Sequence, residues 1–289
     1  MTKNSARIAL HAFLQQGSTH EKSDLLQYLS PIEKQVLEKL PKTYGNPLTD
    51  LETTASMLRH IHPSWIAPFL RTLPEKEIGL FLAALEHSRG HIIGKELLYK
   101  KSLPKLTDHG KTFLQTTLLG YLTAEIDDLL PRAFLPESPL NVLLELSDEE
   151  LALSLDYLGL HDLSVEVRQI IEKQKLQAIY DTLSPSQLHY LKILTQSQEP
   201  IAFTRMGLAS WNGDQEKLRS LIRQRGGNRL AKALWGQDNS LIWHILHKLD
   251  VARALIVKKL LSPLDNSRST QLLIHQIIEF INYSRKQHE

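Results

Sequence analysis

The sequence predicts an all-α fold made of many short helices, and three observations support this. Leucine recurs at helical spacing through most of the 289 residues. Long runs of alternating Val, Ile, Thr and Tyr, which build β-sheets, are missing. Serine followed three residues later by Glu or Gln repeatedly marks the start of a helix.

Composition indicates a folded protein and excludes several kinds of chemistry. Hydrophobic residues make up 42% of the chain and charged residues 23%, both ordinary values for globular proteins. The chain has no cysteine, which excludes a disulfide framework, a thiolate nucleophile and any zinc site with sulfur ligands. No signal peptide is recognisable, and no apolar run approaches the ~20 residues that cross a bilayer. We therefore expect a soluble, cytoplasmic protein.

Charge is distributed unevenly along the chain. The formal net charge is +2, but residues 203–289 contain 14 Lys and Arg against 7 Asp and Glu, a net charge of +7. The preceding residues contain 20 against 25, a net charge of −5. A basic C-terminal third favours an acidic protein surface, a nucleic acid or an anionic lipid as partner.

Capping boxes predict where three helices begin. Ser30, Ser147 and Ser184 each precede a Glu or Gln by three residues, so the serine oxygen accepts a free amide while the longer side chain reaches back. Pro31 and Pro185 follow at first helical positions, where no amide hydrogen is needed. Breaks between helices are predicted where Gly, Pro, Asn or Ser gather, at 44–47, 88–90, 131–139, 198–200, 226–227 and 262–266.

A weak internal repeat predicts how the helices are arranged. The apolar positions of LPEKEIGLFL (73–82) recur in LSDEELALSL (146–155), and GNRLAKAL (227–234) continues the pattern. Such recurring short helices predict stacked helix pairs, in an armadillo-like array or right-handed superhelix with two or more subdomains. Because three prolines cannot sit inside one helix, residues 131–139 mark the main boundary between subdomains.

The candidate groups for catalysis or metal binding have simpler interpretations. His60 and His62 would point to different faces of a helix, so a helix start with Pro63 at its first position is favoured over a metal site. Asp127 and Asp128 would also diverge on a helix, which favours a solvated face over a general acid and base. We therefore expect no enzyme activity, no cofactor, no metal ion and no small-molecule substrate.

Two glycines and two tryptophans in the C-terminal third each have a structural interpretation. Gly226 and Gly227 could open a helix whose free amides hold a phosphate. No preceding strand and no P-loop spacing accompany them, so an interhelical turn is favoured. Trp235 and Trp243, eight residues apart, would share one face of a helix and pack in the core.

The densest basic run is the best electrostatic candidate for a docking surface. Arg219 and Arg223 form an i, i+4 pair on one helix face, and Arg225, Arg229 and Lys232 follow them. A solvated surface is the simpler interpretation of such a run. Because no aromatic residues are interleaved for base stacking, a single-stranded nucleic acid is disfavoured.

The last third carries an ordered series of helical motifs. A leucine-alanine helix ends in Ala-Leu-x-Gly, and a leucine helix, an Arg-Ala pair and an isoleucine-rich helix follow. The residues that carry this order are Leu230, Ala231, Ala233, Leu234, Gly236, Leu241, Ile245, Leu249, Arg253, Ala254, Ile274, Ile277, Ile278 and Ile281. The order resembles the C-terminal domain of FliG, the flagellar rotor switch protein family.

A second segment resembles the middle domain of the same family, which carries Glu-His-Pro-Gln followed by Ile-Ala-x-x-Leu-x-x-Leu. Ile61 and Ser64 replace the motif's Glu and Gln, and the spacing is kept by His62, Pro63, Ile66, Ala67, Leu70 and Leu73. In the family this region binds the next ring protein. The resemblance therefore implies a partner contact at His62 and Pro63, to which we add the adjacent Trp65. Asp214 matches one residue of the family's stator-facing helix.

The resemblance also implies a division into segments. They are an N-terminal helical segment at 1–45, shorter than the family's first domain, a middle-like domain at 46–135, a helical linker or armadillo-like subdomain at 136–200, and a C-terminal-like domain at 201–289. The implied partners are ring proteins of a flagellar basal body or type III secretion system, together with further copies of the chain. Membrane association would then occur only through partners, at the cytoplasmic face of the inner membrane.

The sequence therefore predicts a non-enzymatic cytosolic scaffold or adaptor with partner-binding residues His62, Pro63, Trp65, Asp214, Arg219 and Arg223. Besides an enzyme, which the lack of a titratable cluster with readable geometry disfavours and a deep pocket of converging polar groups would reopen, two alternatives stay open. The first is a helical protein that binds nucleic acid through its basic C-terminal third, with affinity that falls steeply with salt. The second is another secretion-system accessory or chaperone-like adaptor that shares only the helical architecture.

Overall fold

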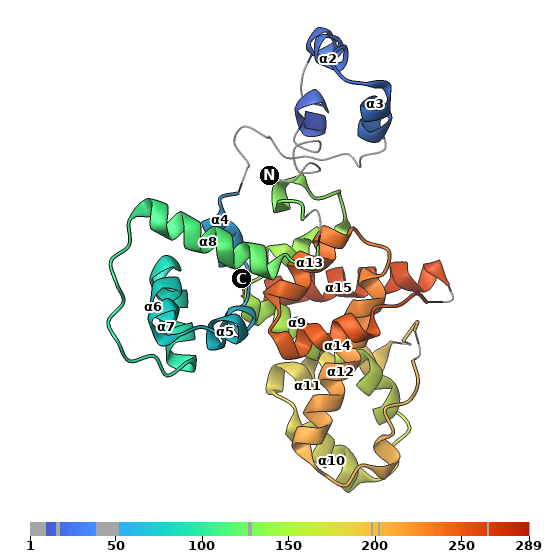
Figure 1. Cartoon of the computed structure of the whole chain (residues 1–289). Coiled ribbons are helices and arrows are strands. Elements are labelled where there is room, and N and C mark those ends of the chain that lie inside the picture. Colours follow the sequence, from blue (N-terminus) through green and yellow to red (C-terminus); the bar gives the residue numbers. More distant parts are fainter. Residues whose placement is uncertain are drawn as a thin grey trace. The chain divides into compact units, whose positions relative to one another are not determined.

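The described part of the chain is helical and divides into two compact units. The computed structural model describes residues 10–15, 18–38, 52–126, 129–197, 199–201, 203–264 and 266–288. Within these ranges there are helices and no β-strand, as the leucine spacing predicts (Figure 1). The first unit contains the described residues up to Ser138 and those of 237–250, and the second contains those of 139–236 and 251–289.

This division differs from the four consecutive segments expected from the sequence. One boundary falls between residues 138 and 139, at the end of the proline-rich stretch. The segments 136–200 and 201–289 are joined, however, because α9 (Asp148–Val167) packs along α12 (Gln215–Leu234). Residues 237–250 lie in the C-terminal third of the sequence but belong to the first unit.

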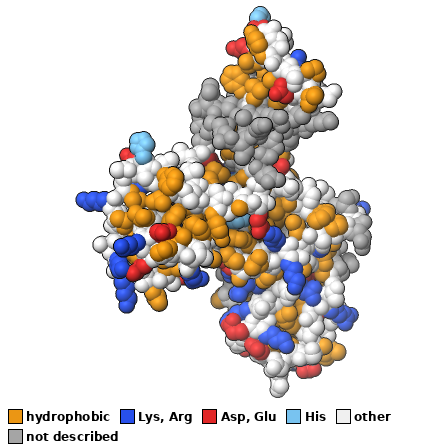
Figure 2. Space-filling view, viewed as in Figure 1, with side chains coloured by type: hydrophobic (Ala, Val, Ile, Leu, Met, Phe, Trp, Pro, Cys, Tyr) orange, Lys and Arg blue, Asp and Glu red, His pale blue; other side chains and the backbone are white. Residues whose placement is uncertain are grey.

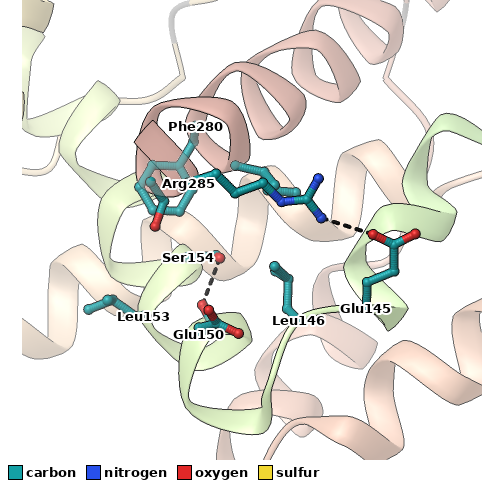
Figure 3. Close-up of a pocket in the computed structure, with 9 residues that line it drawn as sticks. Glu145, Leu146, Glu150, Leu153, Ser154, Phe280 and Arg285 are labelled. Atoms are coloured by element: carbon teal, nitrogen blue, oxygen red, sulfur yellow. Dashed lines mark hydrogen bonds and ion pairs between the residues drawn. The ribbon is translucent and has the colours of Figure 1, made fainter. Parts of the chain in front are cut away.

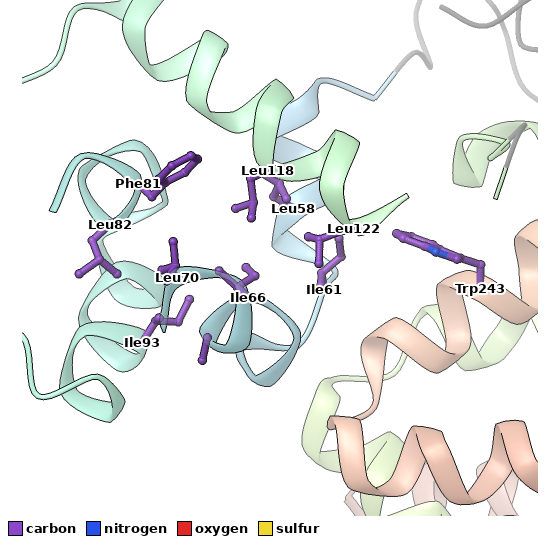
Figure 4. Close-up of a cluster of buried hydrophobic side chains, with 11 residues drawn as sticks. Leu58, Ile61, Ile66, Leu70, Phe81, Leu82, Ile93, Leu118, Leu122 and Trp243 are labelled. Carbon is purple, nitrogen blue, oxygen red and sulfur yellow. The ribbon is translucent and has the colours of Figure 1, made fainter. Parts of the chain in front are cut away.

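The first unit is built around a cluster of apolar side chains. Its helices are α2 (Thr19–Leu26), α3 (Pro31–Glu38), α4 (Thr54–Arg59), α5 (Pro63–Arg71), α6 (Glu75–Ala84), α7 (His87–Glu96), α8 (Asp108–Leu122), η1 (Arg132–Phe134) and α13 (Asn239–Lys248). Helix α8 packs on α4 and α6, while α5, α6 and α7 pack on one another. Leu58, Ile66, Leu70 and Leu118 are buried in the cluster, and Trp243 of α13 joins them (Figure 4).

Helix ends in the first unit follow local sequence, with one exception. The backbone amide of Ser30 donates to Glu33, and the Glu33 amide donates to the serine oxygen, which confirms the capping box before α3. The predicted break at 88–90 is wrong, since these residues lie inside α7. Gly90 is there for packing, because a Cβ at this position would lie 2.6 Å from the Leu82 carbonyl oxygen.

The second unit is centred on the long helices α9 and α12. It also contains η2 (Pro139–Leu144), α10 (Lys173–Thr182), α11 (Pro185–Gln196), η3 (Leu208–Ser210), α14 (Val251–Leu260) and α15 (Ser267–His288). Helix α11 packs on α9, and α14 and α15 pack on α12. The capping boxes of Ser147 with Glu150 and Ser184 with Gln187 both form, as predicted.

Glycines allow α9 and α12 to approach closely. The interhelical turn predicted at Gly226 and Gly227 is wrong, because both residues are buried inside α12. A Cβ on Gly226 would lie 1.7 Å from the Leu155 carbonyl oxygen, and one on Gly159 would lie 2.0 Å from that of Ile222. The two helix backbones therefore touch, and only glycine fits at the crossing.

Trp235 and Trp243 have different environments. Helix α12 ends before Gly236, whose φ of 82° turns the chain, so Trp235 and Trp243 do not share a helix face. Trp243 is buried, as predicted, but Trp235 is 43% exposed and the prediction of a core position for it is wrong. The predicted break at 44–47 and the pair Asp127–Asp128 lie outside the described residues.

Candidate protein-interaction site

The turn that was predicted to bind a partner is built at the start of α5. His62 is the N-cap residue, and its Nδ1 accepts the backbone amide of Ser64 at 3.2 Å. Pro63 occupies the first helical position, which confirms the predicted helix start. The capping arrangement fixes the exit angle of the chain, so Trp65 projects from the first turn of a rigid helix.

This turn holds a helix from much later in the sequence. The His62 amide donates to the carbonyl of His247 at 2.7 Å, and the Trp65 indole Nε1 donates to the carbonyl of Leu249 at 2.9 Å. Both acceptors lie at the C-terminal end of α13, where helix carbonyls lack partners of their own. The candidate site therefore binds the end of a helix through two donors.

A stack of three aromatic rings continues the contact. The His247 ring lies between Trp65, with ring centres 4.2 Å apart, and Trp243, at 3.9 Å. Trp243 in turn packs into the apolar cluster of the first unit, which includes Ile61 and Leu122. The stack of three rings thus connects the hydrogen-bonded turn to the hydrophobic core.

The other end of α13 is held by polar contacts near residue 130. Ser240 Oγ accepts the Leu130 amide at 3.1 Å, and His244 Nε2 donates to the Leu130 carbonyl at 2.8 Å. Burial lowers the pKa of His244 to about 4 despite this hydrogen bond, and neighbouring charge at Arg132 acts in the same direction. Burial also lowers the pKa of His60 to about 4. Both imidazoles are neutral at physiological pH.

The basic run of α12 does not form one surface. Asp214 caps the helix by accepting the Lys217 amide, Arg219 pairs with Glu216 at 2.5 Å, and Arg223 Nε lies 3.4 Å from an Asp156 carboxylate oxygen. Because Arg219 and Arg223 each have an acidic neighbour, their charges are partly balanced locally. The predicted site residues of this unit are capping and ion-pairing groups on one half-exposed helix.

Arg229, from the same run, is fully buried and organises a polar network that sequence analysis did not find. Its guanidinium donates to Asp162 at 2.6 Å, to Gln276 at 2.7 Å and to Glu199 at 3.2 Å. His161 is 2.7 Å from the other Glu199 oxygen. Burial alone would raise the pKa of Glu199, but the His161 hydrogen bond and the Arg229 charge lower it to about 2.

This network joins elements that are far apart in the sequence. Asp162 lies on α9, Arg229 on α12 and Gln276 on α15, while Glu199 follows α11. The four side chains are shielded from solvent and bond to one another, although Arg229 Nε and Asp162 Oδ2 have no hydrogen-bond partner among the described residues. The network fits a role in fixing these helices. The only sign of this network in the sequence was Arg229, a charged residue within a helical pattern. Its partners are decided by tertiary packing.

The second unit also carries an open groove formed by residues 145–146, which follow η2, and by α9 and α15. Its volume is about 390 Å³, and Leu146, Leu153 and Phe280 are among the side chains that line it (Figure 3). Arg285 and Glu145 form an ion pair of 2.9 Å beside it. The lining combines apolar and charged groups, which suits an amphipathic segment of a partner.

Within the described residues, no group of three or more His, Asp or Glu side chains is placed to hold a metal ion. None of the described helices is long and apolar enough to span a bilayer. Comparison with known proteins gives no match among family models, curated proteins or solved structures.

Proposed function

We propose that the chain is a non-enzymatic scaffold or adaptor that acts by binding other proteins. The observation that carries the proposal is the site at His62, Pro63 and Trp65, which accepts the C-terminal end of a helix through two hydrogen bonds and an aromatic stack. A surface that donates hydrogen bonds to the main-chain carbonyls at a helix end and stacks on a ring is suited to bind helices of similar pattern in other chains.

The architecture supports an assembly role in the same way. In an armadillo-like array each helix pair packs only on its neighbours, so a missing layer at one end can be supplied by another chain. We propose that α13, which is separated in sequence from the other helices of its unit, fills such a layer. We propose that copies of the chain, and ring proteins, supply equivalent helices in an assembly.

The resemblance to FliG suggests which assembly this is. We propose a cytosolic ring or ring-associated structure of a type III secretion system or a flagellar basal body, with membrane association through the partners. Asp214, Arg219 and Arg223 would contribute a second contact on the half-exposed side of α12. Their acidic neighbours make this contact selective for a charge pattern and leave little attraction for phosphate alone.

The test is affinity purification of the full chain from its native cell at low salt, with identification of every retained protein. Ring components of a secretion or basal-body assembly are expected. The Trp65→Phe variant, which keeps an aromatic ring but loses the bond to the Leu249 carbonyl, should retain less of them. Trp235→Ala is the matched control, because that indole is outside the site and partly exposed.

The alternative functions predict other results from the same purification. Recovery of nucleic acid that is released steeply by salt, without protein partners, would replace the scaffold proposal with nucleic-acid binding. Recovery of a small metabolite alone would also contradict it. Equal retention of ring components by wild type and Trp65→Phe would keep the adaptor function but move the binding surface elsewhere.

A further inference from the structure

An unusual backbone conformation occurs where α7 ends. The Leu98 amide donates to the Lys95 carbonyl at 3.2 Å and the Tyr99 amide to the Gly94 carbonyl at 2.9 Å, the two bonds of a Schellman turn. This turn requires a left-handed residue, usually glycine. Leu98 occupies the position with φ 56°, and it is the one non-glycine residue of the described chain with a positive φ.

The left-handed conformation of Leu98 does not bury its side chain. The next residue, Tyr99, packs against the apolar cluster of the first unit, and this anchor turns Leu98 outward. Leu98 is 79% exposed. The turn itself would form more easily with glycine or asparagine, so the fold does not explain the choice of leucine.

The connection from α7 to α8 continues as an apolar and basic surface. Residues 97–107 contain three lysines, Lys100, Lys101 and Lys105, and no acidic residue. All three lysines are exposed, and Leu103 between them is 40% exposed. Lys101 has one acidic neighbour, Glu75, at 2.6 Å. Figure 2 shows Lys and Arg side chains gathered along this edge of the first unit, with hydrophobic side chains among them.

We propose that the α7–α8 connection, residues 97–107, binds the surface of an anionic lipid bilayer. Leu98 and Leu103 would enter the boundary between headgroups and acyl chains, and the lysines would lie among the phosphates. Lysine suits this place because its methylene stem lies along apolar surface while its ammonium group reaches the headgroups.

Two features favour a bilayer over an acidic protein. The exposed leucines belong to the turn and the irregular connection that follow α7, and neither lines the groove of about 190 Å³ that α4, α6, α7 and α8 form in the same unit. A protein partner would have to supply pockets that match these isolated side chains, whereas a fluid headgroup layer takes them up without matching shape. The proposal does not rest on the scaffold function, and it adds a direct lipid contact to the membrane association through partners proposed above.

The test uses the full chain and vesicles of pure phosphatidylcholine or of two parts phosphatidylcholine to one part phosphatidylglycerol. Flotation should recover the wild-type protein with the anionic vesicles and not with the neutral ones. Leu98→Gly should reduce this recovery although it relieves the backbone strain, so its thermal unfolding temperature should stay equal or rise. Weaker binding by a more stable protein cannot be attributed to misfolding.

Charge is tested by Lys100→Ala with Lys105→Ala. Each lysine contributes about a fivefold factor at an anionic surface, so the pair should weaken binding about 25-fold. Lys173→Ala with Lys217→Ala, two exposed lysines of the second unit, is the control and should bind as wild type does. Equal binding to both vesicle types, or anionic binding that survives the Leu98 and lysine variants, would overturn the proposal. Loss of an acidic protein partner without any vesicle binding would assign the surface to that protein.

Discussion

Replacing Gly226 by alanine should destabilise the second unit, although alanine is the better helix former. In an exposed helix the change would stabilise by about 1 kcal/mol. At Gly226 the new Cβ would lie 1.7 Å from the Leu155 carbonyl oxygen and 2.6 Å from its carbonyl carbon. These are backbone atoms of α9, which no change of rotamer can move aside.

The steric clash of the new Cβ outweighs the gain in helix propensity. Ordinary van der Waals contact requires more than 3 Å, so α9 and α12 must separate by more than an ångström at the crossing. Overpacking against flexible side chains already costs about 1–3 kcal/mol, and a rigid backbone places this case at or above the upper end. We therefore expect a net loss of about 2 kcal/mol or more in the free energy of unfolding of this unit.

Hydrogen exchange measured by mass spectrometry can assign the loss to the two helices. Peptides from 148–167 and 215–234 should exchange about 30-fold faster in Gly226→Ala, because protection there reports the opening free energy of the unit. Gly120→Ala on α8 is the matched control, since its Cβ would meet nothing within 4 Å, and it should leave exchange equal or slower. Unchanged or increased protection of both helices in Gly226→Ala would refute the close backbone contact.

Three further predictions concern the buried groups of each unit. Arg229→Met should destabilise the second unit by about 3–5 kcal/mol because it leaves Asp162 and Glu199 buried without their cation, whereas Arg223→Met, at a half-exposed pair, should cost under about 1 kcal/mol in urea unfolding. Trp243→Ala should cost about 3–5 kcal/mol and lower the thermal transition of the first unit, while the exposed Trp235→Ala should change it far less. The pKa of His244 is about 4 in the folded protein against 6.5 for a free side chain, so the unfolded state binds more protons between these values. The contribution of His244 to the free energy of unfolding is therefore fully present above about pH 6.5 and falls by about 3 kcal/mol as the pH drops to about 4. His244→Gln should remove this part of the pH dependence, as measured by urea titrations at several pH values.

Local features of the sequence predicted the helix starts well. Each of these starts is fixed within one helical turn, so it does not depend on the rest of the fold. The side chains of Ser30, Ser147 and Ser184 accept backbone amides, and Pro63 takes the first helical position, where no amide hydrogen is needed. The proline-rich stretch predicted one unit boundary for the same reason. The overall all-α character followed from the helical spacing of leucine, which recurs in most of the described helices.

Features fixed by tertiary packing could not be read in the same way. A pair of glycines within a polar stretch has the local signature of a turn, yet Gly226 and Gly227 are inside α12 because another helix crosses there. Arg229 has the local signature of a surface cation, and only the approach of α9, α15 and residue 199 makes it a buried one. In both cases the deciding neighbour lies at least 28 residues away in the chain.

Helix α13 has the local sequence pattern of a helix, but tertiary packing alone decides which unit it joins. Its sequence, with leucine spacing and a Gly before it, is that of one more helix in the C-terminal series, and nothing local assigns it to the first unit. Its partner at Trp65 lies 184 residues before Leu249. Because the bonds to His62 and Trp65 use main-chain carbonyls, the site selects a helix end with a stacking ring more than a particular sequence. Under the proposed adaptor function, the same surface would accept the helix end of a neighbour. Because Trp65→Phe also removes a hydrogen bond within the first unit, its thermal unfolding has to be measured beside the purification.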